Sequence, residues 1–138
     1  MSSYLSVYIV PKRKSEKEEK KHILILSYSR SSDIYQYFDE NIHPAFVGVE
    51  DTRYTPLNKE NLGVVLSDIG KDIDRAKSRL ELYEKYASSN AEYIEEIMSQ
   101  KEYLEDLEYC KTQISVIEDI VDNAEFYDDI EEVSCNIG

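Results

Sequence analysis

The most regular hydrophobic pattern in the chain lies between Asn58 and Ala87. Apolar side chains recur there at alternating spacings of four and three residues, which is typical of a helix that packs against another helix. The seam consists of Leu62, Leu66, Ile69, Ile73, Ala76, Leu80, Tyr83 and Ala87. Gly63 and Gly70 lie within it, and each weakens a helix by about 1 kcal/mol relative to alanine. The pattern predicts a long helix whose packing compensates for these glycines.

A second apolar stripe follows the sequence Ser88–Asn90 and has a polar break at Gln100 and Lys101. Its members are Tyr93, Ile94, Ile97, Leu104, Leu107, Cys110, Ile114, Ile117, Val121 and Ala124. A short connection at Ser88–Asn90 predicts two antiparallel helices, each arm about 40 Å long at 1.5 Å per residue. The last apolar residues of the stripe, from Ile117 onward, extend beyond the start of the first helix, so we expect them to pack on the remaining elements.

Two strands are predicted near the N-terminus. Residues Ser2–Val10 alternate between apolar and small polar side chains, and Pro11 ends the pattern. Residues His22–Ser29 form the second strand, and the uninterrupted apolar run Ile23–Leu26 predicts that both of its faces are covered. Between the strands, Lys12–Lys21 is a run of charged residues without an apolar side chain, which we expect to be the solvated, disordered tip of a hairpin.

The remaining segments are short. Residues Ser29–Ile42 predict a helix to about Asn41, with Ser31 or Ser32 as its N-cap. Further along the chain, Ala45–Val49 predicts a third strand and Glu50–Leu57 a loop. The C-terminal residues Phe126–Gly138 are expected either to add an edge strand through Ile130–Val133 or to be mobile.

Together these elements predict an α+β fold, in which a small antiparallel β-hairpin or sheet with a short helix bears a long antiparallel helical hairpin, an arm that resembles a coiled coil. We expect residues 1–138 to form a single domain. Within it, residues 1–57 would form the base, residues 58–125 the hairpin, and residues 126–138 an acidic tail.

Charge is distributed unevenly along this chain. Residues 91–138 contain two basic and fifteen acidic residues, which accounts for the whole formal net charge of −13. Exposed tyrosine beside carboxylates is typical of protein contacts, so the second helix is a candidate surface for binding a protein with a basic surface. The candidate residues are Glu92, Glu95, Glu96, Glu102, Glu105, Asp106, Tyr103 and Tyr109. The alternatives are a solvated face that aids solubility, or a DNA mimic that occupies the site of a nucleic-acid-binding protein.

A second candidate site lies where the second predicted strand meets the short helix. Arg30, Ser31 and Ser32 could bind a small anion or a nucleotide, because backbone N–H groups at a helix N-terminus attract anions. The alternative is ordinary capping of that helix by Ser32, and Asp33 would repel an anion.

Motifs for catalysis are absent from the sequence. The two histidines, His22 and His43, lie beside neither a cysteine nor a serine-nucleophile motif, and no zinc, EF-hand or phosphate-loop spacing occurs. We therefore expect no enzyme activity, no metal and no cofactor. The negative charge argues against direct nucleic-acid binding.

Partners and location follow from the same composition. Two isolated cysteines and the lack of a signal or membrane-spanning segment predict a cytoplasmic protein that does not bind a membrane. Abundant Ile, Tyr, Lys and Asn favour an AT-rich genome, as in many low-GC bacteria and their phages, so a phage or mobile element is one candidate source. Pairing of copies into a homo-oligomer is a further hypothesis, with the Gln100/Lys101 break or an exposed strand edge as the place where they meet.

Overall fold

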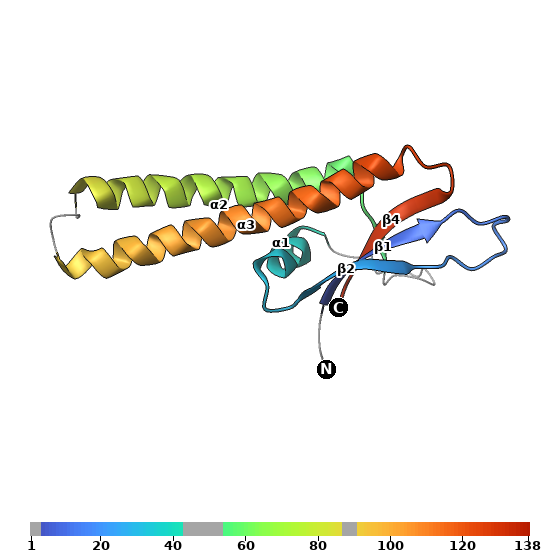
Figure 1. Ribbon diagram of the computed structural model, residues 1–138, viewed down its shortest axis with the longest axis horizontal. Helices are drawn as coiled ribbons and strands as arrows, with labels where there is room; N and C mark the ends of the chain where they lie inside the picture. The colour runs from blue at the N-terminus through green and yellow to red at the C-terminus, as the bar shows by residue number, and fades with distance from the viewer. Residues whose placement is uncertain (1–3, 43–53, 87–90) are drawn as a thin grey trace.

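The computed structural model describes residues 4–42, 54–86 and 91–138. The elements in chain order are β1 (Tyr4–Pro11), β2 (Ile23–Ser29), α1 (Asp33–Asn41), β3 (Thr55–Pro56), α2 (Lys59–Tyr86), the 3-10 turn η1 (Ala91–Tyr93), α3 (Ile94–Ala124) and β4 (Ile130–Ile137). The long helices α2 and α3 lie side by side and project from a base formed by the sheet and α1 (Figure 1). The predicted α+β fold with a helical hairpin is confirmed. The predicted strand Ala45–Val49 and turn Ser88–Asn90 lie outside the described residues.

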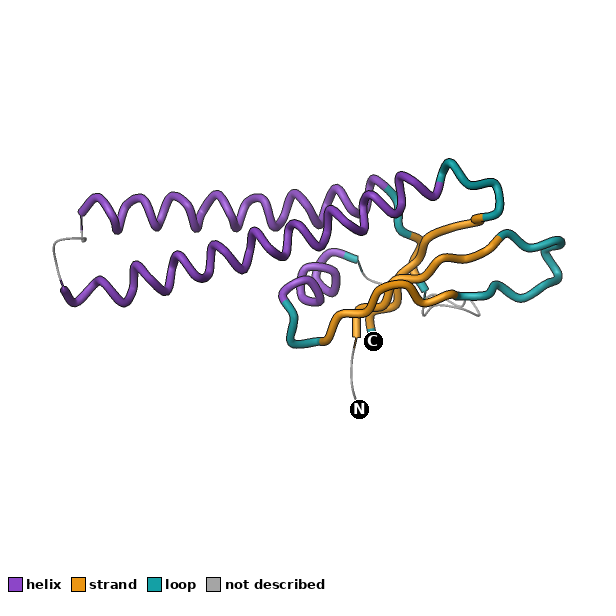
Figure 2. The backbone as a smooth tube through the Cα atoms, viewed as in Figure 1, coloured by secondary structure: helices purple, strands orange, loops and turns teal. Residues whose placement is uncertain are grey.

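The sheet has the strand order β2-β1-β4-β3, and all of its neighbours are antiparallel (Figure 2). The predicted hairpin of β1 and β2 is confirmed. The edge position expected for the C-terminal strand is wrong, because β4 lies between β1 and β3 and pairs with β1 from Ile137 to Ile130. Residues Thr55–Pro56, expected in a loop, pair with β4 instead.

The main core lies between the helices and one face of the sheet. Val7 on β1 is opposite Leu26 on β2 and Cys135 on β4, and directly opposite residues share a face. Buried seam residues from both long helices complete this core, as the heptad pattern predicts: Leu62, Ile69, Ile73, Ala76, Leu107, Ile114, Ile117 and Val121. The stripe of α3 starts later than predicted, because Tyr93 and Ile94 are about half exposed.

Polar contacts attach α1 to α2 beside this core. The Tyr37 hydroxyl donates a hydrogen bond of 2.5 Å to Oδ2 of Asp72, and the Asn41 amide donates one of 2.8 Å to Asp68. Burial raises the pKa of Tyr37, and the hydrogen bond to Asp72 raises it further. These contacts hold the short helix, and with it the base, against the first helix of the arm.

The opposite face of the sheet bears a small aromatic cluster. The imidazole of His22 stacks on the ring of Tyr54 with 3.6 Å between centroids, and Tyr8 meets both rings edge-on. Because Tyr8 is opposite Ser134 in the ladder, the two side chains share this face. His22 therefore has a packing role at the start of β2.

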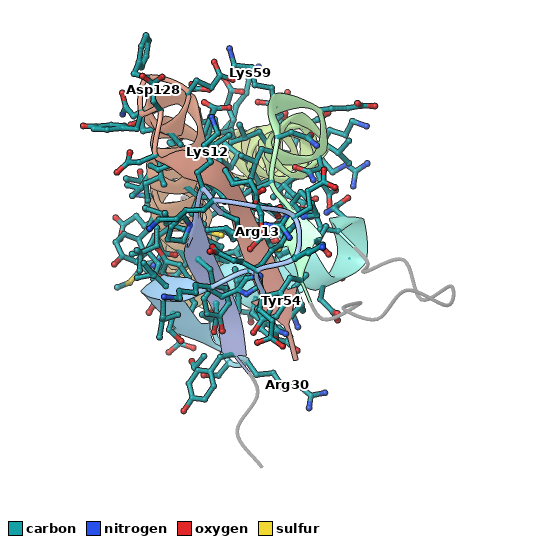
Figure 3. All side chains as sticks on the ribbon, turned by 90° about the vertical axis from the view of Figure 1, so that its right-hand side faces the viewer. Lys12, Arg13, Arg30, Tyr54, Lys59 and Asp128 are labelled. Atoms are coloured by element: carbon teal, nitrogen blue, oxygen red, sulfur yellow. The ribbon has the colours of Figure 1, made fainter. Side chains whose placement is uncertain are left out.

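The charged tip is attached to the sheet, which corrects the expectation of a freely solvated, disordered loop. Arg13 forms an ion pair of 3.1 Å with Glu131, and Lys20 forms one of 2.5 Å with Glu132. The Arg13 guanidinium also donates to the main-chain carbonyl groups of Glu16 and Glu18. Figure 3 looks onto this end of the molecule, with Arg13 labelled. Acidic residues of β4 thus neutralise part of the basic run.

The prediction that both faces of β2 are covered is wrong. This strand is at the end of the strand order, and in the part of the chain that the structure describes it pairs only with β1. Ile23 is 52% exposed and Leu24 is 55% exposed. A run of apolar residues that is typical of an interior strand therefore lies at an edge of the sheet.

Candidate functional site

Five exposed residues form one stripe along the distal half of α3, and we call it the acid stripe. Its members are Glu95, Met98, Glu102, Glu105 and Tyr109. They are spaced by three or four residues, which places them on one side of a helix. The buried residues Ile97, Leu107 and Cys110 are on the other side, against the rest of the protein. The first four members of the stripe line a shallow hollow together with Ser99 and Lys101.

Ion pairs distinguish the acidic residues that face α2 from those on the acid stripe. Glu108 pairs with Lys77 across the arm at 3.9 Å. Glu96 accepts a hydrogen bond of 3.2 Å from the Gln100 amide, and this amide's oxygen accepts one of 3.3 Å from Arg79. Of these two residues only Glu96 is a predicted candidate, and it therefore already has a partner within the protein.

Cross-arm contacts also explain the polar break in the second apolar stripe. Gln100 contacts Arg79 on α2, and Lys101 pairs with Glu84 on α2 at 3.3 Å. Both residues of the break thus join the two helices of one chain. The break therefore gives no support to a contact between copies at this place.

The remaining carboxylates are open to solvent. Within the part of the chain that the structure describes, no hydrogen bond or ion pair engages the side chains of Glu95, Glu102, Glu105 and Asp106. All four residues are exposed. Glu92 is also exposed, but it belongs to the turn η1 ahead of α3 and has an interaction of its own. Four carboxylates without a partner in the described chain thus lie close together on the distal half of α3, three on the acid stripe and one at the adjacent Asp106.

The two predicted tyrosines occupy different surroundings. Tyr109 is 67% exposed on the acid stripe. Burial raises the pKa of Tyr28 and the neighbouring Tyr109 adds to the rise, so Tyr109 lies near β2. Tyr103 instead lines a polar cleft beside α1 with Asp33, Tyr37 and Asp72. It therefore does not belong to the acid stripe.

Sequence reasoning missed Met98, which is 65% exposed between Glu95 and Glu102. The signal was available, because Met98 follows Glu95 by three residues and precedes Glu102 by four. Methionine is flexible and polarisable, so it adapts to irregular partner surfaces. An exposed Met and Tyr between carboxylates give the acid stripe both apolar and charged contact groups.

The candidate anion site is largely self-contained in this structure. Ser32 occupies the N-cap position of α1, but its hydroxyl donates to the Ser29 carbonyl oxygen instead of accepting from a helix N–H. The hydroxyls of Ser29 and Ser31 are 3.0 Å apart and bond to each other. Arg30 is exposed (Figure 3). The local hydrogen bonds therefore account for these serines without an anion.

Groups suited to catalysis or metal binding are sparse among the described residues. No cluster of three or more His, Cys, Asp or Glu side chains there has a geometry that fits a metal ion. Cys110 and Cys135 are buried, and burial raises the pKa of each thiol to about 12. A thiol with this pKa is a poor nucleophile at neutral pH. The other histidine, His43, lies outside the described residues.

No protein-family model, curated protein or solved structure matches this chain. Among the described residues, no helix has the length and apolar character needed to cross a membrane. The arguments about function below therefore start from the surface of the arm.

Proposed function

We propose that this protein is a non-enzymatic binding protein whose acid stripe contacts a basic surface on another protein. The observation behind the proposal is the separation of charge on α3. Glu108 pairs with Lys77 of α2 and Glu96 accepts a hydrogen bond from Gln100 of its own helix, whereas the carboxylates of the acid stripe have no partner within the described chain. A face kept only for solubility would need no exposed Met98 and Tyr109 among these charges.

The charged and apolar groups of the acid stripe would make different contributions. An exposed ion pair adds about 0–1 kcal/mol, so the three glutamates would mainly accelerate and orient encounter with a basic partner. Complete burial of an apolar side chain contributes about 1.5–3 kcal/mol. Met98 and Tyr109 would therefore supply most of the affinity, and the carboxylates would select the charge of the partner.

A specific version of this proposal is DNA mimicry. The partner would then be a nucleic-acid-binding protein, and the acid stripe would occupy its phosphate-binding surface. The chain itself has the wrong charge to bind nucleic acid directly, because phosphates must be neutralised by basic groups. Competition by duplex DNA for the captured partner would distinguish the mimic from other basic-protein binders.

The test is capture of partners from the source cell with the tagged full-length chain. The altered variant replaces the open carboxylates with amides: Glu95→Gln, Glu102→Gln, Glu105→Gln and Asp106→Asn. The control variant removes the same charge elsewhere, at exposed acids that also have no partner in the described chain: Glu40→Gln, Asp74→Asn, Glu81→Gln and Glu125→Gln. Circular dichroism checks that both variants retain their helices.

We expect the wild type and the control variant to capture a basic protein at low salt, and the altered variant to lose it. Binding should also weaken between 0.1 and 1 M salt, because the Debye length falls from about 10 Å to about 3 Å. Capture of the same partner by the altered variant, or capture that is insensitive to salt, would contradict the proposal.

A further inference from the structure

The outer edge of β2 is an exposed strand edge. No residue in Ile23–Ser29 is charged, none is proline, and within the described residues β1 is the only neighbouring strand. Ile23 is opposite Ile9, which is itself opposite Val133 on the face toward the helices, whereas Leu24 is opposite Tyr8 on the other face. Both are more than half exposed. The edge therefore presents free main-chain hydrogen-bonding groups with apolar side chains on both faces.

The other edge of the sheet is protected more strongly than the edge of β2, which has a bulge at Ile25 but neither charge nor proline. There β3 has only two residues, and one of them is Pro56. Short edge strands, proline and charge are the usual means by which proteins prevent pairing with another chain. The contrast between the two edges indicates that the β2 edge is covered by a further strand.

We propose that the β2 edge pairs with β2 of a second copy of this chain, antiparallel and about a two-fold axis. The two four-stranded sheets then become one continuous sheet. Both paired edges would be the same neutral, largely apolar strand, so apolar side chains would meet apolar or small polar side chains on either side of the bulge at Ile25. The strand is neutral, so it offers nothing to the basic partner proposed above, but it matches its own sequence.

The neighbouring surface of α3 would extend this contact. Tyr109 lies near Tyr28 of β2, and Val116 is two helical turns further along the same side of α3. Tyr109 is 67% exposed and Val116 is 44% exposed. A seven-residue strand spans only about 23 Å, and a standard interface buries about 800 Å² on each partner. Contact with Val116 brings the interface toward that size, so we expect dissociation in roughly the micromolar range. Tyr109 lies at the border of this contact and stays with the acid stripe for the basic partner.

The first experiment measures mass in solution by sedimentation over about 1–200 µM protein. We expect the wild type to reach twice the 16.1 kDa of one chain. Leu24→Lys places a charge on the edge and should weaken dimerisation at least tenfold. The matched control is Leu82→Lys on α2, because Leu82 is 56% exposed, against 55% for Leu24. The control should dimerise like the wild type, and the melting temperatures show that both variants are folded.

A wild type that remains monomeric throughout this range, or a Leu24→Lys variant that dimerises like the wild type, would overturn the inference. A second measurement locates the contact through the distance between spin labels attached to the variant Ser27→Cys. Position 27 is exposed and accepts a label, whereas the native Cys110 and Cys135 are buried. Strand pairing places the two labelled Cα atoms within roughly 20 Å, because each residue adds about 3.3 Å along a strand. A dimer with labels more than about 40 Å apart would place the contact elsewhere and refute β2 pairing.

Salt separates this inference from the proposed function. Main-chain and apolar contacts are little affected by ionic strength, so the dimer should persist at 1 M salt, at which the basic partner is lost. The variant lacking the open carboxylates should still dimerise. Either proposal can therefore fail without the other.

Discussion

The two buried thiols make stability sensitive to alkaline pH. Cys110 and Cys135 are each 1% exposed, and both belong to the main core. Burial raises the pKa of each thiol from 9.0 to about 12, and for Cys110 the charge of Asp33 adds to the effect. The native protein therefore keeps both thiols neutral at a pH at which the unfolded chain ionises them.

The sign and the magnitude follow from these values. Below pH 9 the thiols are neutral in both states and have no effect on the pH dependence. Between pH 9 and 12 only the unfolded chain releases the protons, so the free energy of unfolding falls by about 1.4 kcal/mol per pH unit for each thiol. From pH 8 to pH 10 the two thiols together should remove roughly 3 kcal/mol. This is a large share of the 5–15 kcal/mol typical of a folded protein.

Urea unfolding at pH 8 and pH 10 in the presence of a reducing agent measures this loss. The variants Cys110→Ala and Cys135→Ala will each be less stable at pH 8, because a buried sulfur is removed. Each single variant should nevertheless avoid roughly half of this loss of roughly 3 kcal/mol between the two pH values, and the double variant nearly all of it. A double variant with the same loss as the wild type would refute the reasoning, because the loss would then come from other groups.

Two further predictions concern the arm and its attachment. Gly63→Ala and Gly70→Ala should each raise the free energy of unfolding by about 0.5–1 kcal/mol, because an added Cβ meets nothing within 4 Å at either position. Urea unfolding measures this gain, and no gain would show that the helix is strained there. Tyr37→Phe should lower it by about 1 kcal/mol by removing the hydrogen bond to Asp72, and in the background Asp72→Asn the same change should cost less, as a double-mutant cycle would measure.

The helical arm could be predicted from sequence because its signal is local. Seven-residue periodicity fixes both the helical state and the face that is buried, and Leu62, Ile69 and Ile73 are buried as predicted. The start of the second stripe was misplaced for a physical reason. Tyr93 and Ile94 have the spacing of core residues, but they lie at the distal end of the arm, far from the base.

The sheet was less predictable because strand order is not a local property. Val133, Cys135 and Ile137 alternate with polar residues, so the strand itself leaves a signal in the sequence. The sequence does not show which strands lie beside β4, because β1 and β4 are separated by most of the chain. The same difficulty led to the wrong expectation for β2. Its apolar run predicts that other elements pack on both of its faces, but it does not show which elements these are.

The candidate site was predicted at the level of the helix and not of the face. The sequence identifies an acidic helix, but only the rotation of α3 shows that Glu108 and Glu96 have partners while Glu95, Glu102 and Glu105 do not. The same rotation places Tyr103 in the cleft beside α1. A one-residue change in helix phase would reverse these assignments, which is why composition alone could not make them.

The two proposed surfaces would reinforce each other in a dimer. Pairing through β2 would join the two sheets into one, and a helical arm would project from each half. Each arm would present its own acid stripe. A partner with two basic surfaces, or one that is itself repeated along DNA, could then bind both stripes at once. The second contact would be intramolecular, and such linkage can raise the overall affinity by about 10²–10⁴ without a new contact when the geometry permits it. Stripes that are individually weak, as exposed ion pairs are, would gain the most from this arrangement.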